Sequence, residues 1–174
     1  YQILQRLVRL MAPILSFTAE EIWAVAGGGE DATVFTHTWD EFPAAGYSRE
    51  LLGRWGKIRS VRAEVQKQLE EARVAGKIGS SLQAEVQIRA SGGKLALLQS
   101  LQDDLRFVLI TSSAVLTPVA AAADEAVIVT PSAHAKCERC WHYRDDVGAD
   151  AAHPGLCGRC VSNLYGAGEA RAHA

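Results

Sequence analysis

Long apolar stretches and a marked excess of charge of one sign are both missing from this sequence of 174 residues. The longest apolar run, residues 114–123, is too short to cross a bilayer and is interrupted by Pro118. We therefore expect no membrane partner. The formal net charge of −2 argues against a protein that coats polyanions with its whole surface. Any nucleic-acid binding has to come from local basic patches.

Motifs for nucleotide binding and catalysis are also missing. Neither G-x-x-x-x-G-K-[ST] nor G-x-G-x-x-G occurs, so the sequence shows no loop of the kind that cradles a nucleotide. Asp145 and Asp146 are paired carboxylates, but adjacent loop positions seldom converge on one substrate atom, so a solvated turn is expected there. Since no nucleophile is patterned with a base, we expect no catalytic residue in this chain.

Cysteine is scarce, but its four residues are not scattered. They form two C-x-x-C pairs, Cys137 with Cys140 and Cys157 with Cys160, which are separated by sixteen residues. Two thiolates three residues apart on a tight turn can face one ion, and a second such turn completes a tetrahedral site. The spacing therefore predicts one structural Zn²⁺ per chain, held by four sulfurs at about 2.3 Å.

Redox and disulfide roles suit the cysteines less well than zinc. A redox-active C-x-x-C normally occurs once, beside a βαβ pattern. Disulfides are the main alternative to zinc, but they require an oxidising compartment and no export signal is visible. His142 lies two residues past Cys140, and we expect it outside the set of metal ligands. Reduced cysteines predict a cytoplasmic location. Tyr1 falls within a helical pattern, which suggests a piece of a longer chain.

Helical patterns dominate the first part of the chain. Apolar residues spaced three and four apart over residues 1–12 predict the end of a buried helix. Residues 18–21, Thr-Ala-Glu-Glu, form a capping box that predicts a second helix starting just after Thr18. Phe17 and Ile22 flank this box as a hydrophobic staple. Residues 34–39 are expected to be extended.

The longest helix is predicted over residues 49–75, with Ser48 as its N-cap and Gly76 as its stop. One stripe at helical spacing is expected to face the core, namely Leu51, Trp55, Ile58, Val61, Val65, Leu69 and Ala72. Three arginines lie along one flank of this stripe: Arg59, Arg62 and Arg73. This flank is either a solvated helix face or a basic surface that meets a phosphate backbone.

Strand patterns follow. Residues 82–89 alternate between apolar and polar side chains, which predicts a half-buried strand. Residues 107–111 and 127–130 predict two further strands, and residues 115–119 a possible third. Pro118 would confine that third strand to an edge.

The predicted fold class is α+β. It comprises a helical bundle over residues 1–80, a small α/β insertion over 81–131 and a four-cysteine zinc ribbon or knuckle over 132–174. The small polar residues 166–174 are expected to be frayed.

Several segments resemble one enzyme family. Residues 136–143, Lys-Cys-Glu-Arg-Cys-Trp-His-Tyr, and 156–164, Leu-Cys-Gly-Arg-Cys-Val-Ser-Asn-Leu, closely resemble the C-terminal zinc module of bacterial isoleucyl-tRNA synthetases. Residues 11–23, Met-Ala-Pro-Ile-Leu-Ser-Phe-Thr-Ala-Glu-Glu-Ile-Trp, are similar to the helical anticodon-binding domain of the isoleucyl, valyl and leucyl enzymes. Residues 59–73 and 77–82 resemble the long helix and turn of that domain in the isoleucyl enzyme.

The resemblance implies a parent enzyme that activates isoleucine with ATP and attaches it to its tRNA. The family's ATP-binding signatures, of the type His-Ile-Gly-His and Lys-Met-Ser-Lys-Ser, do not occur in this sequence. Nothing here resembles the editing domain. The resemblance therefore implies a part that binds the anticodon stem-loop and works together with the remainder of the parent synthetase.

The zinc module and the long helix offer aromatic and basic side chains of the kind that contacts RNA. The candidate tRNA contacts are Arg139, Trp141, Tyr143, Arg144, Arg159, Arg59, Arg62 and Arg73. Trp141 could instead plug the small core over the metal site. Arg139 and Arg159 are expected to be exposed, since the backbone turns their neighbouring cysteines inward.

Two other functions fit parts of the sequence. A DNA-repair glycosylase ends in a zinc finger with similar cysteine spacing, but it needs a catalytic amine at its own N-terminus, where this chain has Tyr1 in a helical pattern. A zinc-stabilised protein-interaction module is the third possibility.

Overall fold

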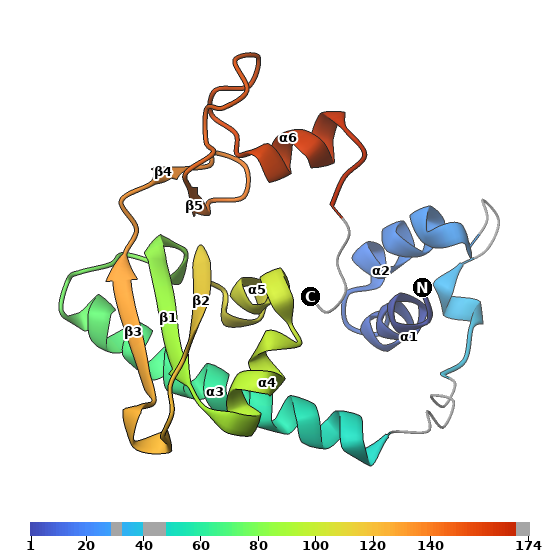
Figure 1. Ribbon diagram of the computed structural model, residues 1–174. Helices are drawn as coiled ribbons and strands as arrows, with labels where there is room; N and C mark the ends of the chain where they lie inside the picture. The colour runs from blue at the N-terminus through green and yellow to red at the C-terminus, as the bar shows by residue number, and fades with distance from the viewer. Residues whose placement is uncertain (29–32, 40–47, 170–174) are drawn as a thin grey trace. The chain divides into compact units, whose positions relative to one another are not determined.

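The computed structural model describes residues 1–28, 33–39 and 48–169 (Figure 1). The chain divides into two compact units, residues 1–47 and residues 48–174. None of the helices within the described ranges has the length and apolarity that a bilayer crossing requires.

The first unit is a small helical cluster. It contains α1 (Gln2–Met11), α2 (Ser16–Trp23), a π-helical turn η1 (Ala24–Gly28) and a 3₁₀ turn η2 (Val34–Thr36). A small core joins these elements, and its buried residues are Val8, Ala12, Ala19, Trp23 and Val34.

Three expectations for this unit were wrong in detail. The helix α2 begins at Ser16, whose hydroxyl donates to the Ala12 carbonyl oxygen at 3.0 Å, so Thr18 lies inside the helix instead of capping it. Phe17 is 89% exposed, so it does not form the expected staple. Residues 34–36 are helical instead of extended, because the Thr33 hydroxyl accepts from the Phe35 backbone N–H and begins the turn.

The helix α1 is also less buried than its pattern predicts. Of its apolar side chains Val8 is buried, whereas Ile3, Leu7 and Leu10 are at least half exposed. The 3–4 spacing correctly identifies a helix, but among the described residues of this unit no element covers most of its apolar face.

The second unit is built on α3 (Arg49–Val74) and a three-stranded sheet. The Ser48 hydroxyl accepts from the Leu51 N–H at 3.2 Å and caps the helix as predicted. Gly76 ends the helix at φ +69°, a conformation that glycine adopts without strain.

The sheet has the order β2-β1-β3 (Figure 1). The central strand β1 (Ala84–Ala90) pairs in parallel with β2 (Ser113–Pro118) and antiparallel with β3 (Ala126–Pro131). A parallel pair needs a crossover connection, which is supplied by α4 (Gly92–Gln99), the 3₁₀ turn η4 (Gln102–Asp104) and α5 (Leu105–Leu109). Two further 3₁₀ turns, η3 (Ser81–Gln83) and η5 (Ala122–Asp124), precede β1 and β3.

Helices cover one face of this sheet. The side chains of Ala84, Val86, Ile88 and Ala90 alternate along β1 and are buried, whereas those between them are more exposed. They share one core with α3, α4 and α5, whose buried residues are Ile58, Val61, Val65, Leu69, Ala72, Leu98, Leu105 and Leu109. The stripe predicted for α3 is thus confirmed except at Leu51, which is 51% exposed.

The α+β class is confirmed, and β2 is an edge strand as Pro118 predicts. The strand predicted over residues 107–111 is wrong, since Phe107 belongs to the short helix α5. The long helix shares its core with the sheet, so the predicted limit at residue 80 falls inside the second unit. The division at residues 80 and 131 stays a prediction.

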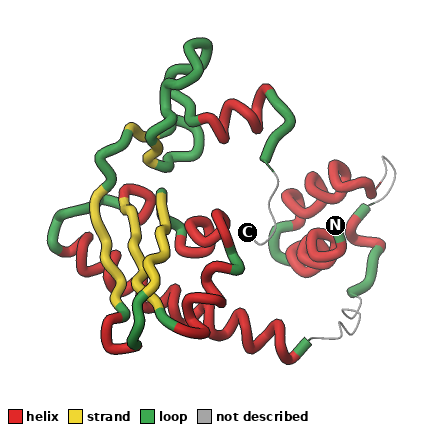
Figure 2. Tube along the Cα trace, in the orientation of Figure 1, coloured by secondary structure: helices red, strands yellow, loops and turns green. Residues whose placement is uncertain are grey.

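The cysteine module follows β3 and consists mainly of turns (Figure 2). The first knuckle, the turn with Cys137 and Cys140, lies between the two strands of a small ribbon, β4 (Ala135–Lys136) and β5 (Tyr143–Arg144). The second knuckle, with Cys157 and Cys160, leads into α6 (Gly158–Tyr165). Several contacts join the module to the rest of the second unit. Among them, the Tyr143 N–H donates to the Ser112 Oγ at 2.6 Å, and the Ser132 Oγ donates to the Glu85 carboxylate, also at 2.6 Å.

Candidate metal centre and nucleic-acid interface

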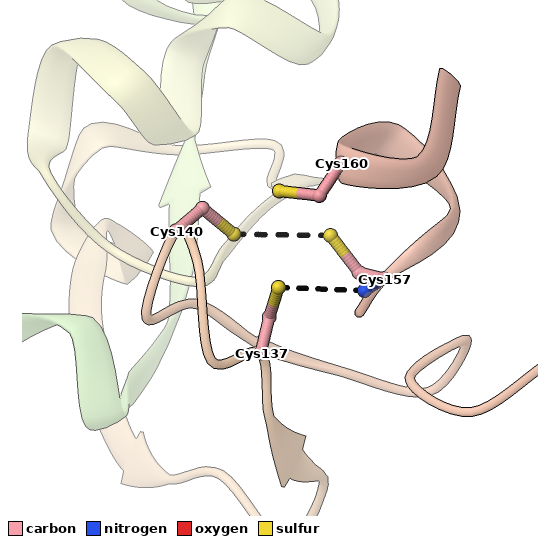
Figure 3. Close-up of side chains that lie close together, drawn as sticks. All are labelled: Cys137, Cys140, Cys157 and Cys160. Atoms are coloured by element: carbon pink, nitrogen blue, oxygen red, sulfur yellow. Dashed lines mark hydrogen bonds between the residues drawn. The ribbon is translucent and has the colours of Figure 1, made fainter. Parts of the chain in front are cut away.

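The four cysteine side chains point toward one common centre (Figure 3). Cys137 and Cys140 lie on the turn between β4 and β5, Cys157 is the N-cap of α6, and Cys160 lies in its first turn. All four sulfurs lie within 4.8 Å of one another, and the Cys140 and Cys157 sulfurs are 3.8 Å apart. Three of the four residues are fully buried.

Backbone hydrogen bonds fix the first knuckle. The Cys137 N–H donates to the His142 carbonyl oxygen, and the Trp141 N–H donates to the Cys137 carbonyl oxygen, each at 2.9 Å. The Cys157 N–H donates to the Cys137 sulfur at 3.4 Å, which ties the second knuckle to the first (Figure 3). The sulfur positions are therefore set by the fold of the two turns.

The electrostatics of the cluster favour a bound cation. Burial by itself would raise the pKa of the Cys137 thiol, but backbone hydrogen bonds at Cys140, Cys157 and Arg139 outweigh burial and lower it to about 6. Burial raises the pKa of the Cys157 thiol to about 12, and the neighbouring Cys140 sulfur adds to this rise. Four thiolates this close repel one another, so a positive ion is needed for all of them to be deprotonated together.

The donor set and its dimensions fit Zn²⁺. Four sulfurs at about 2.3 Å from one ion in tetrahedral geometry lie about 3.8 Å from one another. The Cys140 and Cys157 sulfurs are 3.8 Å apart, which agrees with this value and is far longer than a disulfide bond. All four ligands would be thiolates, so no position is left for a substrate and the ion would stabilise the fold.

The aspartate pair and His142 lie outside this cluster of sulfurs. The Asp146 carboxylate accepts from the Gly158 N–H at 3.1 Å at the start of α6, where a negative charge is favourable. The His142 Nδ1 is 3.1 Å from the Cys140 carbonyl oxygen, and its ring meets Phe107 edge-on at 5.8 Å. Asp146 and His142 therefore have structural partners within the second unit.

The predicted RNA contacts of the zinc module differ in exposure. Trp141 is 59% exposed, so it is not a core plug. The Lys136 Nζ lies 5.1 Å from its ring centroid. Arg139 is exposed as expected, and its Nη1 donates to the Cys160 sulfur at 3.5 Å. Tyr143 and Arg144 are half-buried.

Arg159 departs from expectation. Its side chain is only 16% exposed, and it is paired with Glu169 at 3.1 Å. The Glu169 carboxylate also accepts from the Asn163 side-chain amide at 3.1 Å, and the Glu169 N–H donates to the Asn163 side-chain oxygen at 2.8 Å. Residues 166–169 are therefore tied to α6 and are not frayed, because Glu169 pairs with a charge on that helix.

The basic flank of α3 is open to solvent in part. Arg59 and Arg73 are exposed and Arg62 is half-buried. Arg73 pairs with Glu70 at 2.6 Å on the same helix, which supports the solvated-face interpretation at that position. The role of the three arginines in binding stays a prediction.

Two basic side chains, one in the module and one beside it, were missed as candidate contacts in the sequence. Lys136 precedes the first cysteine and lies over Trp141. Arg106 lies on α5, and its guanidinium is 4.7 Å from the Phe107 ring centroid. A basic residue beside the first ligand could have indicated Lys136, but only the packing of α5 reveals Arg106.

Comparison with known proteins agrees with both parts of this description. The family described as "Anticodon-binding domain of tRNA ligase" matches residues 1–88. The family described as "Zinc finger found in FPG and IleRS" matches residues 136–163.

Curated relatives match along nearly the whole chain. Isoleucine–tRNA ligase from Janthinobacterium sp. (strain Marseille) is 61% identical over 168 residues, which is 95% of this chain. The enzyme of the same name from Thiobacillus denitrificans is 63% identical over 97% of the chain, and that from Aromatoleum aromaticum is 58% identical over all of it. The chain spans 18% of the length of each of these relatives. The resemblance stated from the sequence is confirmed, and the chain belongs to the family of anticodon-binding domains of tRNA ligases.

Proposed function

We propose that this chain is the tRNA-recognition part of an isoleucine–tRNA ligase. The parent enzyme activates isoleucine with ATP and attaches it to its tRNA, while this part binds the anticodon stem-loop. The relatives that match the chain carry that name, and residues 1–88 match an anticodon-binding family. The remainder of the parent synthetase supplies the catalytic and editing domains.

The observation that carries this proposal is the exposed Trp141 on the first cysteine knuckle. Its ring is presented to solvent directly beside Cys140, with Lys136 over it and Arg139 exposed next to the same cysteine. Proteins read single-stranded RNA by stacking splayed bases on aromatic rings, while nearby cations contact phosphates. A base of the anticodon loop can stack on Trp141, with its backbone near the two cations.

One structural zinc per chain is part of the proposal. The four sulfurs would hold the ion, and the ion would supply the folding free energy of a module with few apolar groups of its own. The ion itself would not contact the RNA. The side chains of Trp141 and its basic neighbours would do so, because the two knuckles position them. Thiolate ligands stay reduced in the cytoplasm, which is the compartment we propose.

Binding assays with different nucleic acids test this function. The zinc-loaded chain is titrated with unmodified isoleucine tRNA at two salt concentrations, with and without competing duplex DNA. We expect salt-sensitive binding of the tRNA that duplex DNA does not displace. Preference for duplex DNA would instead support the repair-glycosylase alternative, and binding of neither would support a protein-interaction module. The anticodon-binding match over residues 1–88 already argues against the glycosylase.

A further inference from the structure

Three elements distant in sequence meet at the ring of Phe107 on α5. The Arg106 Cζ lies 4.7 Å and the Arg159 Cζ 5.0 Å from its centroid, and the His142 ring lies edge-on at 5.8 Å. Arg106 comes from α5, Arg159 from α6 and His142 from the first cysteine knuckle. The contacts therefore bring guanidinium groups from two different parts of the second unit to one aromatic side chain.

Two of the three arginines at this place have a carboxylate partner, and Arg106 differs from them. Arg144 pairs with Asp146 at 3.5 Å and Arg159 pairs with Glu169 at 3.1 Å. For the Nε of Arg106, which is buried, the described part of the chain offers no hydrogen-bond partner.

The pKa of Arg106 reflects its burial and the positive charges around it. Burial lowers the pKa of Arg106, and the guanidinium groups of Arg144 and Arg159 lower it further. Asp103 and Glu169 act in the opposite direction without cancelling this effect.

A half-buried guanidinium beside two like charges is costly unless an anion compensates it. The planar guanidinium fork matches the geometry of phosphate oxygens, which it binds through two parallel hydrogen bonds. Phe107 holds Arg106 and Arg159 by cation–π contacts, which keeps two of the three cations near one another. This arrangement has the properties of a preformed anion site.

We propose that Arg106, Arg144 and Arg159 form a binding site for one phosphodiester of the tRNA backbone, with Arg106 as its principal donor. This α5 arginine site rests on the proposed function, because RNA is what brings a phosphodiester to the zinc module. His142 and Tyr143 join it in sequence to Trp141. Phosphate contacts fix position and aromatic contacts read bases, so the two surfaces act on neighbouring parts of one RNA loop.

The test compares Arg106→Gln with Arg89→Gln in the zinc-loaded chain. Both variants lose one positive charge from the second unit, but Arg89 lies on β1 and is not one of the three arginines of the proposed site. One lost phosphate contact reduces the slope of log affinity against log salt by about 0.7 to 0.9, which is about five- to eightfold in affinity at 0.1 M salt. We expect this change for Arg106→Gln and no change of slope for Arg89→Gln.

A third variant, Arg106→Lys, separates binding from a structural role. Lysine keeps the charge and loses the fork, so the salt slope should be retained with a smaller loss of affinity than in Arg106→Gln. If both Arg106 variants lower the thermal midpoint but leave the slope unchanged, Arg106 only stabilises the fold and the inference is overturned.

The failure of this inference is distinguishable from the failure of the proposed function. If the unchanged chain binds tRNA and Arg106→Gln binds it equally well with the same slope, the α5 arginine site is rejected while tRNA recognition stands. If the unchanged chain binds no tRNA at low salt, the proposed function and the inference both fail.

Discussion

Trp141 has a backbone conformation that residues with a side chain seldom adopt, at φ +65°. Such a conformation costs about 1–2 kcal/mol for a residue other than glycine. Glycine would close the same turn without that cost, because the turn needs only the N–H that donates to the Cys137 carbonyl oxygen. The large ring is exposed and fills no core, so its presence is better explained by binding than by folding.

We therefore predict that Trp141→Ala weakens tRNA binding. Loss of one stacked base costs about 1–3 kcal/mol, or about fivefold to more than a hundredfold in affinity. Zinc content and thermal stability should not fall, since the ring is exposed. Filter binding and elemental analysis measure these effects. Tyr165→Ala is the matched control, because Tyr165 is a 63% exposed aromatic residue of the same module, stacks on His153 and is not a candidate tRNA contact. Equal affinity of all three proteins would contradict the stacking role.

The pKa values of the cysteine thiols predict how zinc affinity depends on pH. The pKa of Cys140 is raised by burial and that of Cys157 is raised to about 12, so without metal both carry protons at pH 7. Zinc binds their thiolates and must release these protons, so affinity rises with pH and is lost as pH falls.

Between pH 6 and 8 we expect at least about a hundredfold gain in zinc affinity per pH unit, since about two protons or more are released. Competition with a chelator of known proton affinity measures it. A zinc affinity that stays constant over this range would show that the thiols are already deprotonated, in conflict with the raised pKa of Cys157.

At the scale of elements, α3 depends on its buried stripe. Ile58 is 1% exposed and packs in the core shared with the sheet, whereas Leu52 on the same helix is 56% exposed. We predict that Ile58→Ala lowers the free energy of unfolding by about 2–5 kcal/mol, through lost burial and the cavity left behind. Leu52→Ala should change it by less than about 0.5 kcal/mol. Urea unfolding measures both, and equal effects would mean that the stripe does not face a packed core.

The elements that were located correctly from the sequence have start, stop and periodicity signals within their own residues. Ser48 and Gly76 mark both ends of α3, and a long stripe leaves no doubt about its period. The helix α5 was missed because its five residues, Leu-Arg-Phe-Val-Leu, are too short to show a period and are rich in strand-forming types. It is helical because Leu105 and Leu109, four residues apart, are both buried in the shared core.

The same contrast holds for the site. The zinc ligands are predictable because each pair is three residues apart and the chemistry depends on that spacing. The meeting of Arg106 and Arg159 at Phe107 depends on how α6 packs on α5, which no local pattern encodes. The pairing of Arg159 with Glu169 could not be foreseen either, since it requires the chain after α6 to fold back on the helix.

At the scale of the whole molecule, the second unit combines two sources of stability. The core of α3 and the sheet is apolar, whereas the core of the cysteine module is the sulfur cluster with Val147 and Leu156 packed against it. The module is attached to the sheet and to α5 by polar and ring contacts, among them the hydrogen bond from the Tyr143 N–H to the Ser112 Oγ and the contact of Arg159 with Phe107. Loss of the metal should therefore unfold the module and leave the apolar core intact.

Cys157→Ser tests this separation. A hydroxyl is a poor zinc ligand, so the metal should be lost and residues from about 135 onward should unfold. Most of the helical circular dichroism should remain, because α3 has 26 residues and α6 has eight. The affinity for tRNA should fall, because Trp141 and its basic neighbours lose their fixed positions. Chelator treatment of the unchanged chain is the control and should reproduce both effects. Loss of most of the helical signal would show instead that the second unit folds as one cooperative whole, with the metal supporting α3 and the sheet as well.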